Sequence, residues 1–91
     1  MVNITDIDQG LARIQEEDFN LIRDNAYGTY VEVGTFHGAS AYAASGNADY
    51  VWTIDIYDWQ PKVYGEKPAF FKGTSIDFAE KYGSDIEIDV L

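Results

Sequence analysis

Apolar positions recur with the period of a helix in the first part of this chain. Ile7, Leu11 and Ile14 are spaced so that they fall on one side of a helix. Their spacing predicts an amphipathic helix, or a pair of helices, over residues 5–26, with Thr5 as the N-cap. We expect this N-terminal part to cover one face of a sheet.

The pattern then changes to short runs rich in β-branched and aromatic residues, which are typical of strands. These runs predict strands over residues 30–33, 51–54, 69–72 and 86–91. A glycine-bounded turn over 34–38 and a short helix over 39–45 connect the first two. Strand, turn, helix and strand make a βαβ unit, so we expect parallel strands and a right-handed crossover. A helix through Tyr82, capped by Ser75, follows the third strand. The predicted fold class is α/β.

Composition limits the size and partners of this fold. With 91 residues, we expect a single domain over 1–91. Acidic residues outnumber basic ones 16 to 6 and give a formal charge of −10, which disfavours binding to nucleic acid or to an anionic membrane. There is no cysteine and a single histidine, His37, so we expect no metal site. No long apolar run or basic leader is visible, and a cytoplasmic location is expected.

Two carboxylates mark a candidate ligand site. Ligands of open α/β sheets bind outside the carboxyl ends of the strands, where Glu32 and Asp55 are both expected. Asp55 follows Gly34 by 21 positions, close to the distance at which an acid reaches a ribose in nucleotide-binding βαβ units. The combination of glycine turn, short helix and terminal acid predicts binding of a nucleotide or nucleoside.

Several segments resemble one family. Residues 30–40, with the pattern Glu-x-Gly-x-x-x-Gly-x-Ser, resemble the first motif of class I S-adenosylmethionine-dependent methyltransferases, closest to the small-molecule and sugar-type branch. Residues 51–56 resemble the next motif, 71–78 the segment beside adenine, and 85–91 the start of the fourth strand. The resemblance covers nearly the whole chain but only the N-terminal half of the family domain. It implies a Rossmann-like, mostly parallel sheet with strand order 3-2-1-4.

The resemblance implies S-adenosylmethionine as the cofactor. The residues that would bind it are Glu32, Gly34, Thr35, Phe36, His37, Gly38, Ser40, Asp55, Ile56, Thr74 and Ser75. Asp55 would bind the ribose hydroxyls, Ile56 would pack on adenine, and Glu32 would orient the loop or approach the methionine ammonium. The sequence departs from the family pattern at Phe36, where a glycine is usual, and at Thr74, where an acid is frequent. His37 is either a general base or a residue that shapes the pocket, and the catalytic residues and methyl acceptor stay unassigned.

Three functions are compatible with these observations. The first is a cofactor-binding domain of methyltransferase type, and whether the chain is itself an enzyme stays open. The second is a non-catalytic nucleoside-binding or partner module, and the third is part of a dinucleotide-dependent oxidoreductase. We also expect a homodimer, joined through the apolar C-terminal strand as an exposed sheet edge or through the apolar surface that the missing half of the family domain would cover.

Overall fold

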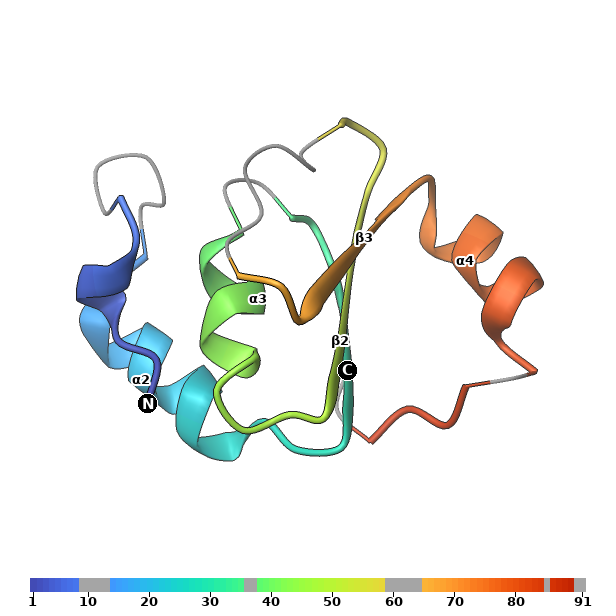
Figure 1. Ribbon diagram of the computed structural model, residues 1–91. Helices are drawn as coiled ribbons and strands as arrows, with labels where there is room; N and C mark the ends of the chain where they lie inside the picture. The colour runs from blue at the N-terminus through green and yellow to red at the C-terminus, as the bar shows by residue number, and fades with distance from the viewer. Residues whose placement is uncertain (9–13, 36–37, 59–64, 85, 90–91) are drawn as a thin grey trace.

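Three parallel strands form the centre of the computed structural model (Figure 1), which describes residues 1–8, 14–35, 38–58, 65–84 and 86–89. They are β1 (Thr29–Val33), β2 (Tyr50–Asp55) and β3 (Pro68–Lys72), in the order β1-β2-β3. The register of β2 pairs Ile54 with Val33 on one side and with Phe71 on the other. The predicted α/β class and parallel βαβ unit are confirmed.

Small residues bring helix α3 (Ala39–Ala44) close to one face of the sheet. Ala41 and Ala44 are buried in one cluster with Val51 of β2. Alanine has little side chain to separate a helix from a strand, so a six-residue crossover helix suffices here. Helix α2 (Glu16–Asn25) packs on the other side of α3.

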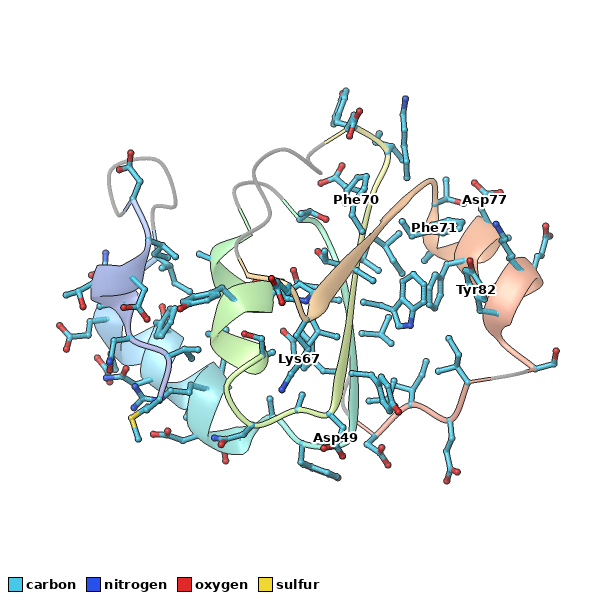
Figure 2. The ribbon with its side chains drawn as sticks, in the orientation of Figure 1. Asp49, Lys67, Phe70, Phe71, Asp77 and Tyr82 are labelled. Carbon is cyan, nitrogen blue, oxygen red and sulfur yellow. The ribbon has the colours of Figure 1, made fainter. Side chains whose placement is uncertain are left out.

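The opposite face of the sheet is covered by aromatic side chains and helix α4 (Ser75–Tyr82). The ring of Phe78 lies 5.3 Å from that of Trp52 and 5.4 Å from that of Phe71, measured between centroids. Figure 2 shows Phe71 and Tyr82 between β3 and α4. Tilted and edge-on pairs of this kind add about 0.5–1.5 kcal/mol to the burial of their apolar area. This cluster holds α4 to the sheet.

The N-terminal region contains a 3-10 turn, η1 (Ile4–Asp6), and then α2, with residues 9–13 outside the described part. Thr5 lies inside η1, so its prediction as a helix cap was wrong. Asn3 precedes this turn, and its backbone N–H donates to the Asp6 carboxylate at 2.9 Å. Ile4 and Phe19 are buried together against α3.

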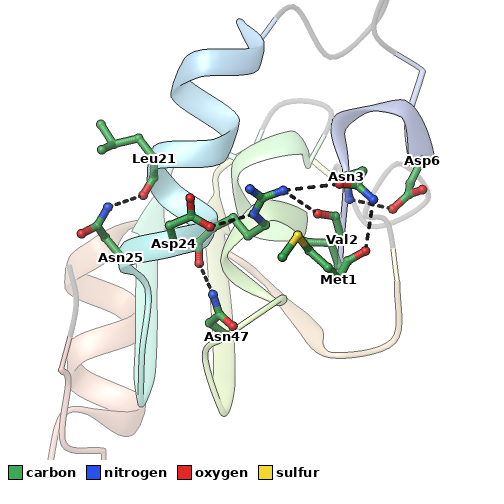
Figure 3. Close-up of polar contacts among 9 residues, drawn as sticks. Met1, Val2, Asn3, Asp6, Leu21, Asp24, Asn25 and Asn47 are labelled. Atoms are coloured by element: carbon green, nitrogen blue, oxygen red, sulfur yellow. Dashed lines mark hydrogen bonds and ion pairs between the residues drawn. The ribbon is translucent and has the colours of Figure 1, made fainter.

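Polar contacts of Arg23 tie this region to the rest of the chain (Figure 3). Its guanidinium donates to the carbonyl oxygen of Val2 at 3.1 Å and forms an ion pair with Asp24 at 2.9 Å. Its own carbonyl accepts a hydrogen bond from the side-chain amide of Asn47, after α3. One residue of α2 therefore joins the N-terminal segment to the connection between α3 and β2.

The predicted fourth strand and the order 3-2-1-4 are not found in the described part of the chain. Residues 86–89 are not in a strand, and residues 85, 90 and 91 lie outside the description. The Asp89 N–H donates to the Thr29 carbonyl at 3.0 Å, but the Asp89 carboxylate accepts from the Thr29 N–H, also at 3.0 Å. The side chain thus takes the donor that a backbone carbonyl would use in a strand ladder. The homodimer stays a prediction.

Gly28 allows this contact at the start of β1. Its φ is +57°, and an added Cβ would lie 2.1 Å from the Asp89 carboxylate, which leaves no room for a side chain.

None of the described helices is long and apolar enough to cross a membrane.

Helix α4 begins with a reciprocal cap. The Thr74 hydroxyl accepts from the Asp77 N–H at 3.1 Å, and the Asp77 carboxylate accepts from the Thr74 N–H at 3.0 Å. Thr74 is therefore the N-cap and Ser75 the first helical residue, which corrects the predicted cap by one position. Hydrogen bonding to the backbone N–H of Thr74, and then to its side chain, lowers the pKa of the Asp77 carboxyl.

We expect Thr74→Ala to lower the free energy of unfolding by about 1 kcal/mol, because it removes one half of this capping box. Urea unfolding followed by circular dichroism measures the change. Thr5→Ala, at an exposed position, is the matched control. Equal stability of the two variants would contradict the capping role.

Candidate ligand site at the carboxyl ends of the strands

The turn after β1 is built on two glycines with left-handed backbone. Gly34 has φ +95° and Gly38 has φ +78°, values that residues with a Cβ rarely adopt. The Gly34 N–H donates to the carbonyl of Ile54 at 2.7 Å, and the Gly38 N–H donates to that of Thr35 at 2.9 Å. The turn is therefore held against β2 and leads directly into α3. Phe36 and His37 lie outside the described residues, so their predicted roles stay predictions.

Glu32 accepts three hydrogen bonds from hydroxyl groups. One carboxylate oxygen accepts from Tyr30 at 3.0 Å and from Ser40 at 2.7 Å, and the other accepts from Thr53 at 2.8 Å. These donors belong to β1, α3 and β2. Glu32 therefore connects the strand before the glycine turn to the helix after it and to the neighbouring strand.

The hydroxyl of Thr53 extends this network to the turn. It lies 2.7 Å from that of Thr35, and both residues are buried. Thr53 has one hydroxyl hydrogen and donates it to Glu32, so Thr35 donates to Thr53. The sequence pattern did not identify Tyr30 and Thr53 as residues of the site. Tyr30 is two positions from Glu32, and Thr53 is two positions from Val51, so each pair is expected on one face of the sheet. Nothing in the sequence indicated that Tyr30 and Thr53 both donate to Glu32.

The environment of Glu32 makes its ionisation costly. Burial raises the pKa of Glu32, and its effect outweighs the hydrogen bonds from Ser40, Thr53 and Tyr30, which lower it. The pKa of Tyr30 is raised by burial first, and then by the charge of Glu32 and the hydrogen bond to it.

Ser40 does not cap α3. Its hydroxyl donates to Glu32, and Gly38 occupies the N-cap position of this helix.

Asp55 brings together the ends of all three strands. One carboxylate oxygen accepts from the Thr35 N–H at 3.0 Å and the other from the Tyr57 N–H at 3.1 Å. Its backbone carbonyl accepts from the Gly73 N–H, after β3, at 2.8 Å. The predicted juxtaposition of Asp55 with the glycine turn is present.

Exposed apolar side chains lie beside Asp55. Val33 and Ile56 are 63% and 56% exposed, and Val33 is paired with the buried Ile54 in the sheet. Thr74 and Ser75 follow β3 at the same edge, and the Thr74 hydroxyl already accepts from Asp77. The carboxyl ends of the strands thus offer a carboxylate, an apolar surface and hydroxyl groups.

A groove of about 570 Å³ lies at the other, amino end of the strands. Gly28, Tyr50, Trp52 and Asp89 are among the residues that line it. It does not include Glu32 or Asp55, so the candidate site is defined by hydrogen-bond geometry and not by this groove. Among the residues that the structure describes, no group of three His, Asp or Glu side chains is placed to hold a metal ion.

Comparison with solved structures gives a likeness of fold. No protein-family model and no curated protein sequence matches this chain. A solved structure described as "A putative sam-dependent methyltransferase from Streptococcus mutans" is similar, with a TM-score of 0.63 and 14% sequence identity. The match covers 77% of this chain and 22% of that one. The chain therefore has a methyltransferase-like α/β fold and spans about a fifth of that structure's length.

We expect the pH dependence of stability to change in Glu32→Gln. The pKa of Glu32 is raised in the folded state, so its contribution to the free energy of unfolding is greatest below its unfolded pKa. That contribution is lost as the pH rises through the folded pKa. The stability of the wild type relative to Glu32→Gln should therefore fall as the pH rises above about 4.5, the ordinary pKa of a glutamate side chain.

Urea unfolding between pH 4 and 8 measures this difference. Glu66→Gln, at an exposed position, is the control for loss of one negative charge. If both variants show the same dependence on pH relative to the wild type, the pKa of Glu32 is not raised in the folded state, and the prediction fails.

Proposed function

We propose that this chain is a cofactor-binding domain of methyltransferase type that binds S-adenosylmethionine at the carboxyl ends of β1, β2 and β3. The observation that carries the proposal is the position of the carboxylate of Asp55, the last residue of β2, which is hydrogen-bonded to the turn after β1. The methyltransferase-like fold supports the same class.

The residues around Asp55 fit an adenosyl group. Asp55 accepts from the N–H groups of Thr35 and Tyr57, and a carboxylate, which offers about four acceptor positions, is the kind of group to which ribose hydroxyls donate. Ile56 follows directly and exposes an apolar surface of the kind on which a purine packs. Thr74 and Ser75 lie after the adjacent strand, where they would contact the edge of the base.

Glu32 fits an orienting role better than direct contact with the cofactor. Its carboxylate already accepts from three hydroxyls on three elements. We therefore infer that Glu32 sets the position of the turn between Gly34 and Gly38, whose backbone would lie against the ribose and methionine parts. The acidic surface favours a ligand with cationic sulfonium and ammonium groups.

The backbone amides of the turn favour this cofactor over a dinucleotide. The N–H groups of Gly34, Thr35 and Gly38 all donate within the protein. A diphosphate is typically held by free N–H groups in such turns, whereas an adenosyl ribose needs acceptors. Asp55 provides the acceptors, and these three amides are not available as donors.

A second candidate function is binding of an adenine nucleoside without methyl transfer. Asp55 and Ile56 would recognise the adenosyl part, which both candidates share. Affinity separates them, because a methyltransferase-type site should bind S-adenosylmethionine and S-adenosylhomocysteine more tightly than adenosine. Equal affinities would favour the second candidate.

We expect Asp55→Ala to weaken binding of S-adenosylmethionine by about ten- to a hundredfold. Hydrogen bonds to a charged group contribute about 1.5–3 kcal/mol, and each 1.4 kcal/mol changes affinity tenfold. Isothermal titration calorimetry with S-adenosylmethionine, S-adenosylhomocysteine, adenosine and NAD measures this directly.

Asp49→Ala is the matched control, because Asp49 precedes the same strand at its opposite end. Thermal unfolding of Asp55→Ala shows whether the loss of its bonds to Thr35 and Tyr57 also unfolds the chain. Unchanged affinity in a folded Asp55→Ala variant would overturn the assignment of the ribose site.

A further inference from the structure

A second groove follows the outer side of the sheet, between β3 and α4. Its volume is about 520 Å³, and it does not include Asp55 or the glycine turn. Within the described sheet β3 is an edge strand, and it begins at Pro68, a residue that sheets tolerate at their edges. The groove therefore lies along a strand with one unpaired side.

The groove combines aromatic surface with positive charge. Trp52, Phe70, Phe71 and Tyr82 line it together with Lys72 and Lys81. None of the described residues lining it is acidic, although the chain has 16 acidic residues and only 6 basic ones. Two of these six thus gather on one groove.

The lysines are available for a ligand. Lys72 ends β3 and Lys81 lies in the last turn of α4, and both are exposed. Neither has a carboxylate partner in the described part of the chain, where the ion pair formed is Arg23–Asp24. Lys81 lies 5.3 Å from the centroid of the Tyr82 ring. Lys67, by contrast, donates to the carbonyls of Ser45 and Ala48.

We propose that this groove binds an extended, acidic segment of a protein partner, which adds to β3 as a further strand. An edge strand offers unpaired backbone N–H and C=O groups, and strand addition uses them for affinity. Alternate side chains of the added strand would lie on Phe71 and the rings around it. Lys72 follows Phe71 in β3 and lies on the opposite face, so carboxylates on that face of the added strand would meet Lys72, while Lys81 adds positive charge on the aromatic side.

Charge favours this partner over the other anionic polymers. A net charge of −10 repels a nucleic acid over its whole length, whereas a short acidic strand needs only the local field of the two lysines. The groove is separate from the proposed cofactor site, because neither Asp55 nor the described residues of the glycine turn line it.

The test is a titration with a synthetic peptide in which glutamate and valine alternate over six residues, with both ends blocked. Calorimetry measures its affinity, and hydrogen exchange measures protection of the backbone amides in β3. We expect binding, protection of β3, and weaker binding at higher salt. A peptide with lysine in place of glutamate should not bind. A peptide with proline in place of both the central valine and the glutamate next to it should bind less tightly, because one of these two positions faces β3 and proline cannot donate to the strand ladder.

The double variant Lys72→Gln/Lys81→Gln should bind the peptide about three- to tenfold more weakly, in line with exposed charge pairs. The control is Gln15→Glu/Asn20→Asp, with Gln15 just before α2 and Asn20 within it. It lowers the net charge by the same two units as the lysine variant and should bind the peptide as the wild type does. Binding that is equal for the two double variants would overturn the location. Binding of the proline peptide as tight as that of the parent, absence of β3 protection, or no binding at all would overturn strand addition.

Discussion

The hydrogen-bonded, partly buried carboxylate of Glu32 is the feature on which the candidate site depends. It accepts hydrogen bonds from β1, α3 and β2, the elements that surround the glycine turn. If this acceptor is removed, three hydroxyl groups lose their common partner, and the shared orientation of the strand end and the helix start is no longer imposed. The turn can be short and rich in glycine because its position is set from outside.

This arrangement is stable without an ion pair. Glu32 carries its charge into a partly buried position in a protein that is already strongly acidic, and its three described hydrogen-bond partners are neutral hydroxyls. Burial raises its pKa, so ionisation at neutral pH costs free energy that packing of the surrounding apolar clusters must offset. A cationic partner would remove this cost but would also bring positive charge next to the place where we propose a cationic ligand.

Local sequence patterns predicted the parts of the fold that depend on neighbouring residues. The strands around Val31 and Ile54, the glycine turn and the short helix of alanines all follow from residues close in the chain. The position of Asp55 against the turn followed from the βαβ topology, because parallel strands end at the same edge. The fourth strand did not follow, since Asp89 bonds Thr29 through its side chain, a choice that alternating acidic and apolar residues do not reveal.

The partners of Glu32 could not be predicted for a different reason. Whether Ser40 caps a helix or donates to a carboxylate depends on where α3 crosses the sheet, and this is set by packing of alanines on Val51. The same packing places Thr53, an interior strand residue, beside both Glu32 and Thr35. A tightly packed alanine helix therefore does more than fill the core: it brings the hydroxyl donors within reach of the carboxylate, and the carboxylate in turn fixes the turn. Core packing and site geometry are in this way one structural feature, and a change that widens the spacing between α3 and β2 would disturb the site before it exposed the core.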